Sequence, residues 1–279
     1  MLKRAYVEIT NICNLRCSFC PGTRRKPRYM AAEEFAAIAG KLRESVQYLY
    51  LHVMGEPLLH PQLPAILAAA EELGFRVCVT TNGTLLEKAG ETLLRCSALH
   101  KVSVSVHSFE GNDGGDMGPY LESVWDFAEK LSQKGVIAAL RLWNEGGAEE
   151  RNGEVLAFLR EKTGERVWEE KRDGSFTLGE KIYLEHAEKF EWPDLSAPES
   201  GTEFCLGLRD QIAVLVDGTV VPCCLDHEGD IPLGNLLEEE LQDILAGEWA
   251  KGIYEGFSCR RPTEELCRRC GYASRFNRG

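Results

Sequence analysis

Residues 10–22 read TNICNLRCSFCPG and place three cysteines, Cys13, Cys17 and Cys20, within eight positions. The segment comes directly after the apolar run AYVEIT, which is typical of a short buried strand. Zinc sites and iron–sulfur clusters usually take four protein ligands, and no residue closely downstream of Cys20 offers a fourth. The spacing therefore predicts a metal centre at the end of a strand, with one coordination position left open.

Short apolar runs alternate with helical patterns along the first half of the chain. Five runs read as strands: residues 5–10, 47–53, 75–81, 101–107 and 136–143. Four stretches between them read as helices: residues 31–44, 62–73, 85–96 and 118–134. This alternation indicates a parallel sheet with right-handed crossovers. With a late α/β unit in the polar stretch 144–204, whose short strand is KIYLEH, we expect an α/β fold, a partial (β/α)6 TIM-like barrel.

The pattern changes near residue 205. The stretch QIAVLVDGTVVP consists of two apolar runs joined by Asp217 and Gly218, which is a strong signal for a β-hairpin. Residues 236–249 have the pattern of a helix. We therefore expect two domains, a barrel over residues 1–200 and a small domain of hairpin plus helix over residues 201–279.

The composition narrows the classes of function. The chain has 279 residues, a formal net charge of −12 and 11 cysteines. The acidic balance argues against a nonspecific binder of duplex DNA, because neutralising phosphates needs clustered Lys and Arg. No apolar run is long enough for a membrane span, and no secretory signal is visible. We expect a cytoplasmic protein whose cysteines are metal ligands or free thiols.

The three-cysteine segment, with Phe19 before its last cysteine, resembles the signature of the radical S-adenosylmethionine (radical SAM) superfamily. The resemblance implies a [4Fe–4S] cluster bound by Cys13, Cys17 and Cys20, with SAM on the open iron. In that family, reductive cleavage of SAM yields a 5′-deoxyadenosyl radical that abstracts hydrogen from a substrate. The cofactor carries this chemistry, and the protein supplies position and exclusion of water.

Two further segments resemble SAM-binding segments of the same family. Gly55 and Glu56 follow the second predicted strand, although Met54 stands where the family has a first glycine. Thr81 and Asn82 end the third strand, with a plain Asn-Gly turn as the alternative.

The next two strands add candidates for contact with SAM or substrate. Ser105 and His107 share one face of the fourth strand by alternation, and a structural polar pair is the alternative. Arg141 lies within the apolar fifth strand, where a charge is costly unless it is paired. It is expected to bind an anionic group of SAM or substrate, with a structural ion pair as the alternative.

The C-terminal cysteines resemble the twitch or short SPASM extension of radical SAM enzymes, which carries auxiliary iron–sulfur clusters. The implied ligands of one auxiliary [4Fe–4S] cluster are Cys205, Cys223, Cys267 and Cys270. Zinc is the alternative, since four thiolates suit it. Cys224 is expected to point to the opposite face from its neighbour, and Cys259 is a substitute ligand.

The expected function is a radical SAM reaction with net two-electron oxidation of the substrate. A small-molecule substrate is favoured because the chain is compact and has one auxiliary set of cysteines, and because the first strand begins near residue 5, leaving no room for an N-terminal leader-binding module. The alternatives are a peptide or protein maturase of the thioether or formylglycine type, then RNA modification through clustered arginines. A zinc-binding module without catalysis is a further alternative. A one-electron donor such as flavodoxin or ferredoxin is implied, and no catalytic base is assigned.

Overall fold

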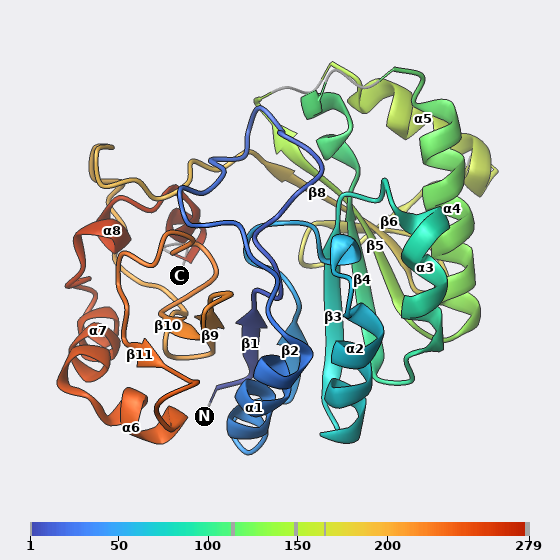
Figure 1. Ribbon diagram of the computed structural model, residues 1–279. Helices are drawn as coiled ribbons and strands as arrows, with labels where there is room; N and C mark the ends of the chain where they lie inside the picture. Colours follow the sequence, from blue (N-terminus) through green and yellow to red (C-terminus); the bar gives the residue numbers. More distant parts are fainter. Residues whose placement is uncertain (1, 113–114, 148–149, 165, 277–279) are drawn as a thin grey trace.

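The computed structural model describes residues 2–112, 115–147, 150–164 and 166–276. The described strands form one sheet of 11 strands in the order β11-β10-β9-β1-β2-β3-β4-β5-β8-β7-β6. Neighbours from β1 through β5 to β8 pair in parallel. Figure 1 shows these strands as a curved row with α2, α3 and α4 along its outer side. The prediction of a partial (β/α)6 barrel, open rather than closed, is confirmed.

The parallel strands and their helices follow the predicted order. The strands are β1 (Arg4–Val7), β2 (Tyr48–Tyr50), β3 (Arg76–Thr81), β4 (Leu99–Ser105), β5 (Ile137–Glu145) and β8 (Ile182–Glu188). The helices between them are α1 (Ala32–Leu42), α2 (Leu63–Glu72), α3 (Leu86–Arg95), α4 (Gly118–Gln133) and α5 (Asn152–Thr163). The predicted fourth strand, residues 101–107, was wrong at its end, because Val106–Ser108 turns into a 3-10 helix.

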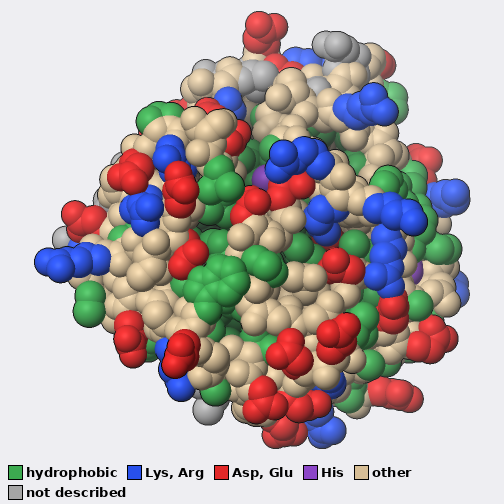
Figure 2. All heavy atoms as spheres, turned by 60° about the vertical axis from the view of Figure 1, so that its left-hand side comes forward, with side chains coloured by type: hydrophobic (Ala, Val, Ile, Leu, Met, Phe, Trp, Pro, Cys, Tyr) green, Lys and Arg blue, Asp and Glu red, His purple; other side chains and the backbone are tan. Residues whose placement is uncertain are grey.

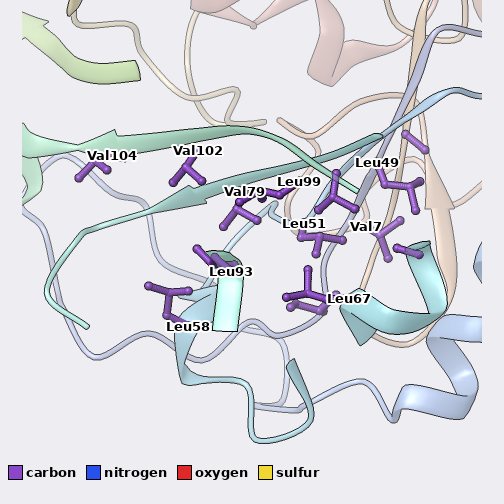
Figure 3. Close-up of a cluster of buried hydrophobic side chains, with 14 of the residues drawn as sticks. Val7, Leu49, Leu51, Leu58, Leu67, Val79, Leu93, Leu99, Val102 and Val104 are labelled. Atoms are coloured by element: carbon purple, nitrogen blue, oxygen red, sulfur yellow. The ribbon is translucent and has the colours of Figure 1, made fainter. Parts of the chain in front are cut away.

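The main core lies between the strands and the helices outside them. Val7, Leu49 and Val79 from three adjacent strands face Leu67 of α2 and Leu93 of α3 (Figure 3). All five side chains are buried. The apolar helix faces cover the outer side of the sheet. The polar loops lie at the carboxyl ends of the strands, where α/β folds bind their ligands.

The late α/β unit is present, with additions. Helix α5 leads into a hairpin of short antiparallel strands, β6 (Glu169–Glu170) and β7 (Ser175–Gly179), and β7 pairs antiparallel with β8. The short strand KIYLEH corresponds to β8, which pairs with β5.

The predicted hairpin at Asp217 and Gly218 is formed by β9 (Gln211–Val214) and β10 (Thr219–Val221). Gly218 has a φ of +89°, which favours glycine. Strand β9 also pairs in parallel with β1, so the hairpin extends the barrel sheet, with β11 (Gly234–Asn235) at the edge. The proposed boundary at residue 200 stays a prediction.

The helix expected over residues 236–249 was wrong in its bounds. The structure has α6 (Leu241–Ala246) and α7 (Glu248–Ser258), followed by α8 (Glu265–Arg268). Gly247 separates α6 from α7 with an extended backbone, at φ −60° and ψ 148°. In the part of the chain that the structure describes, no helix has the length and apolar character needed to cross a membrane.

Candidate active site

The loops after the first four strands meet around one cavity of about 530 Å³, which we call the cluster cavity. The sequence-predicted residues that line it are Cys13, Cys17, Phe19, Cys20, Gly55, Glu56, Thr81, Asn82 and Ser105. In Figure 1 the loop that follows β1 lies at the upper end of the strands, between the barrel and the C-terminal segment. Parallel strands thus bring residues from distant parts of the chain to one edge of the sheet.

Gly55 lets the loop after β2 approach the cluster loop closely. Its φ is +75°, and an added Cβ would lie 2.4 Å from the carbonyl oxygen of Thr10 and 2.9 Å from that of Ile12. The next backbone amide, of Glu56, donates to the Ile12 carbonyl at 2.8 Å. Only glycine fits this close approach. The approach and the hydrogen bond together position the backbone just before Cys13.

Glu56 joins the ends of β2 and β3. Its buried carboxylate accepts hydrogen bonds from the Thr81 hydroxyl at 2.8 Å, the Asn82 amide at 2.8 Å and the Leu58 amide at 3.0 Å. Burial raises the pKa of this carboxyl, and the three donors oppose that effect. Oε1 accepts two of these bonds and Oε2 accepts one, so Oε2 retains a lone pair that can accept a bond from an ammonium group in the cavity.

The thiols of the cluster loop receive amide donors from the barrel. Asn82 Nδ2 lies 3.9 Å from Cys13 Sγ, and Asn112 Nδ2 donates to Cys17 Sγ at 3.1 Å. Burial raises the pKa of Cys17 to about 11, and the Asn112 bond opposes this rise. Hydrogen bonds to sulfur stabilise the thiolate form that a cluster needs. Sequence reasoning missed Asn112, which is the last residue of a short 3-10 helix, Glu110–Asn112, with no recognisable motif.

The arrangement suits a cluster. Among the described residues, no three Cys, His, Asp or Glu side chains converge closely enough to hold a single metal ion. A cubane binds each thiolate at a different iron, so its ligands surround a space instead of converging on one atom. The three thiols lining one cavity fit that requirement.

A second cavity, of about 370 Å³, lies inside the barrel, and we call it the central cavity. His107 and Arg141 line this cavity and not the cluster cavity, whereas Phe19 and Ser105 line both. His107 Nδ1 lies 2.9 Å from the Arg141 carbonyl, and the His107 ring packs on Phe19 with centroids 4.8 Å apart. Burial lowers the pKa of His107 to about 4, so the imidazole is neutral.

Arg141 forms the ion pair that was the structural alternative. Its Nε donates to Glu185 Oε2 at 2.8 Å, and its guanidinium lies over the Trp143 ring at 4.5 Å from the centroid. It nevertheless lines the central cavity, so a role toward a ligand stays a prediction.

His52, which we had not assigned to the site, lies where the two cavities meet and lines both. Its Nδ1 is buried with no hydrogen-bond partner among the described residues. Burial and the nearby charge of Arg141 lower the pKa of His52 to about 3. A buried polar atom without a partner is uncommon in folded proteins and marks a place for a ligand group.

The four C-terminal cysteines line a third cavity, the four-cysteine cavity. They are Cys205, Cys223, Cys267 and Cys270, surrounded by apolar side chains such as Leu225 and Phe257. Burial raises the pKa of all four thiols, and mutual repulsion of the thiolates raises it further for Cys223, Cys267 and Cys270. A bound metal centre would offset that repulsion, so the donor set fits an iron–sulfur cluster.

The other two local cysteines lie elsewhere. Cys224 lines the central cavity and Cys223 the four-cysteine cavity, but both lie in the bend and turn after β10, so the strand alternation expected for them is not the cause. Cys259 caps the end of α7 and is exposed. Neither thiol is among the residues that line the four-cysteine cavity.

Sequence models of two families match the chain. The Radical SAM superfamily matches residues 7–145, and SPASM, an iron-sulfur cluster-binding domain, matches residues 205–271. The sporulation killing factor maturation protein SkfB of Bacillus subtilis (strain 168) is 28% identical over 273 residues, covering 85% of this chain and 63% of SkfB. The chain therefore spans less than two thirds of that relative.

Solved structures share the fold. BtrN in complex with AdoMet and 2-DOIA has a TM-score of 0.64 at 19% identity, covering 97% of this chain and 93% of BtrN. Streptococcus suis SuiB has a TM-score of 0.64 at 17% identity, covering 97% of this chain and 71% of SuiB. With the three-cysteine loop, the open parallel barrel and the C-terminal cysteine set, these matches show that the chain belongs to the radical SAM superfamily of enzymes and carries a C-terminal SPASM iron–sulfur domain.

Proposed function

We propose that this enzyme oxidises a substrate bound in the central cavity by two electrons. One observation carries the proposal: the central cavity shares wall residues with both metal-binding cavities. Phe19 and His52 line the central and cluster cavities, whereas Leu225 and Tyr272 line the central and four-cysteine cavities. A substrate between the two sites would lie close to both.

When bound, SAM and its cluster supply a carbon-centred radical that removes a hydrogen atom, and the auxiliary cluster supplies an acceptor for one electron. The substrate then loses one hydrogen atom, one electron and one proton, which amounts to a two-electron oxidation. The chain positions the substrate and excludes water with aromatic side chains, among them Tyr6, Trp143 and Trp192. Four thiols around one cavity leave no position for substrate on the auxiliary cluster, which favours electron transfer over direct binding.

A small-molecule substrate is the first candidate. The central cavity, at about 370 Å³, is within the range of pockets that bind small ligands. BtrN, whose fold matches over 93% of that chain, was solved in complex with the small molecules AdoMet and 2-DOIA, which is consistent with this candidate.

A peptide substrate is the second candidate. The similarity to the maturation protein SkfB covers 85% of the chain. A surface groove of about 1050 Å³ shares Phe19, Lys189 and Trp192 with the central cavity. An extended segment could lie in this groove and insert one side chain into the barrel.

An RNA substrate has less support. Five of the arginines that suggested it are paired with carboxylates: Arg24 with Glu228, Arg25 with Glu8, Arg28 with Glu34, Arg268 with Glu199 and Arg269 with Glu265. Arg275 instead donates to the backbone carbonyl of Glu188 at 2.7 Å. Arg278 lies outside the described residues. Figure 2, in which the C-terminal side comes forward, shows basic and acidic side chains interspersed on that face, without the continuous basic surface that RNA favours.

The test is anaerobic incubation with SAM and a one-electron donor, flavodoxin or ferredoxin, after reconstitution. We expect about eight irons per chain and formation of 5′-deoxyadenosine. Cys17→Ala should abolish that product, whereas Cys96→Ala, a buried thiol outside the three cavities, should retain it. Zinc alone without iron, or 5′-deoxyadenosine at the native rate from Cys17→Ala, would refute the proposal. Deuterated candidate substrates that pass deuterium into 5′-deoxyadenosine then identify the substrate.

A further inference from the structure

The charged side chains in the wall of the central cavity are all basic. Arg4, Arg141 and Lys189 line it, and its described lining residues include no Asp or Glu. The whole chain shows the opposite balance, with 44 acidic and 32 basic residues. The charged residues of the cavity wall are therefore opposite in sign to the net charge of the chain, although Lys189 pairs with Glu191 at 3.1 Å.

The positive charge of Arg141 is only partly balanced. Its carboxylate partner, Glu185, also binds Lys101, with Nζ 2.5 Å from Oε1. One carboxylate thus faces two cations, so the group formed by Arg141, Lys101 and Glu185 has one excess positive charge, and its three side chains are largely buried. Arg141 Nη1 lies 3.4 Å from the Thr80 hydroxyl, and no described residue accepts a bond from Nη2. The guanidinium can therefore donate to a further group in the cavity.

The two histidines show what the cavity disfavours. The pKa of His52 and of His107 is lowered by burial and by the charge of Arg141, so neither ring takes a proton at neutral pH. Burial is the larger cause and disfavours charge of either sign, whereas the contribution of Arg141 opposes a cation specifically. A neutral imidazole still donates one N–H bond, and the buried Nδ1 of His52 has no partner among the described residues.

We infer that the central cavity binds its substrate through an oxyanion, a carboxylate or a phosphate, that accepts hydrogen bonds from Arg141 and His52. The aromatic wall, including Trp143 and Trp192, packs against the rest of the substrate. Arg141 lines the central cavity and not the cluster cavity, so we assign the oxyanion to the substrate and not to SAM, and competition with SAM tests this assignment. The inference names the substrate class for the proposed function and rests on it.

The test uses calorimetric titration of the anaerobic holoenzyme with three probes that share a phenyl group: phenylacetate, phenyl phosphate and phenethylamine. We expect at least one anion to bind about tenfold to a hundredfold more tightly than the amine. The free energy of hydrogen bonds to a charged group corresponds to a ratio of this size between the two dissociation constants. The tighter anion shows whether the site takes carboxylate or phosphate. Prior saturation with SAM should leave the anion affinity unchanged.

Two variants test the named residues. Arg141→Met and His52→Phe should each weaken binding of the tighter anion by about tenfold. Arg76→Met is the matched control, because Arg76 also lies over an aromatic ring, that of Tyr48, but outside the cavity. Iron content and circular dichroism establish that each variant is folded.

Three results would overturn the inference: equal or absent binding of the probes, displacement of the anion by SAM, or equal losses in Arg141→Met and Arg76→Met. Probe binding does not require SAM cleavage. An enzyme that binds the anion but forms no 5′-deoxyadenosine would therefore refute the proposed function and leave the anion site standing.

Discussion

The carboxylate of Glu8 and the guanidinium of Arg25 form two parallel hydrogen bonds of 2.6 and 2.7 Å. The Glu8 side chain is fully buried, and it also accepts bonds from the backbone amides of Met54 at 3.1 Å and Val216 at 3.0 Å. Arg25 Nε donates to the His227 carbonyl at 2.7 Å. One ion pair thus joins the segment after the cluster loop, the loop after β2 and the turn of the C-terminal hairpin.

Glu8→Gln should destabilise the protein strongly. The substitution keeps the shape of the side chain but leaves the Arg25 guanidinium, whose side chain is 15% exposed, without a counter-charge. We expect a loss of about 3–5 kcal/mol in the free energy of unfolding, measured by urea unfolding of the holoprotein. Lys3→Met is the control, since it breaks an exposed pair with Asp210 and should cost less than about 1 kcal/mol. Equal midpoints for the two variants would contradict this prediction.

Gly55→Ala should displace the cluster loop. The new Cβ would lie 2.4 Å from the Thr10 carbonyl oxygen, and the positive φ would strain any side chain. We expect about four fewer irons per chain after reconstitution, with weaker binding of SAM in equilibrium dialysis. Gly40→Ala in α1 is the matched control, because its Cβ meets no atom within 4 Å and alanine favours the helix. Full iron content in Gly55→Ala would show that the close approach is dispensable.

Asn112→Ala should lower the reduction potential of the N-terminal cluster. The lost bond, 3.1 Å from Nδ2 to Cys17 Sγ, is a donor that stabilises negative charge on sulfur. Redox titration followed by electron paramagnetic resonance measures the change. The auxiliary cluster in the same sample is the internal control, and its reduction potential should be unchanged. A potential that does not move, or a shift of both clusters together, would argue against a specific effect of Asn112.

Cys223→Ala and Cys224→Ala should differ sharply, although the two residues are adjacent. Cys223 lines the four-cysteine cavity and Cys224 the central cavity. We expect Cys223→Ala to lose about four irons per chain, whereas Cys224→Ala should keep them. Iron analysis and the signal of the auxiliary cluster provide the measurement. If Cys224→Ala loses the cluster instead, the ligand set must be reassigned.

The alternation of strands and helices predicted the fold, and the cysteine spacing, through its resemblance to a known family signature, predicted the first cluster loop. Both are local properties, because ligands on one short loop and apolar runs of strand length need no distant partner to be recognised. The same locality identified the Asp217 and Gly218 turn. It failed at Gly247, since the sequence pattern continues through a residue at which the backbone leaves the helix.

Only the tertiary structure decided which residues meet across the sheet. Glu8 contacts Val216, and Arg141 contacts Glu185, because β9 pairs with β1 and β8 pairs with β5. Strand order and register determine such contacts, and neither can be read from the residues beside each partner. The spacing of the cysteines and its resemblance to known families predicted both cysteine sets, whereas the structure was needed to find the basic, aromatic cavity between them.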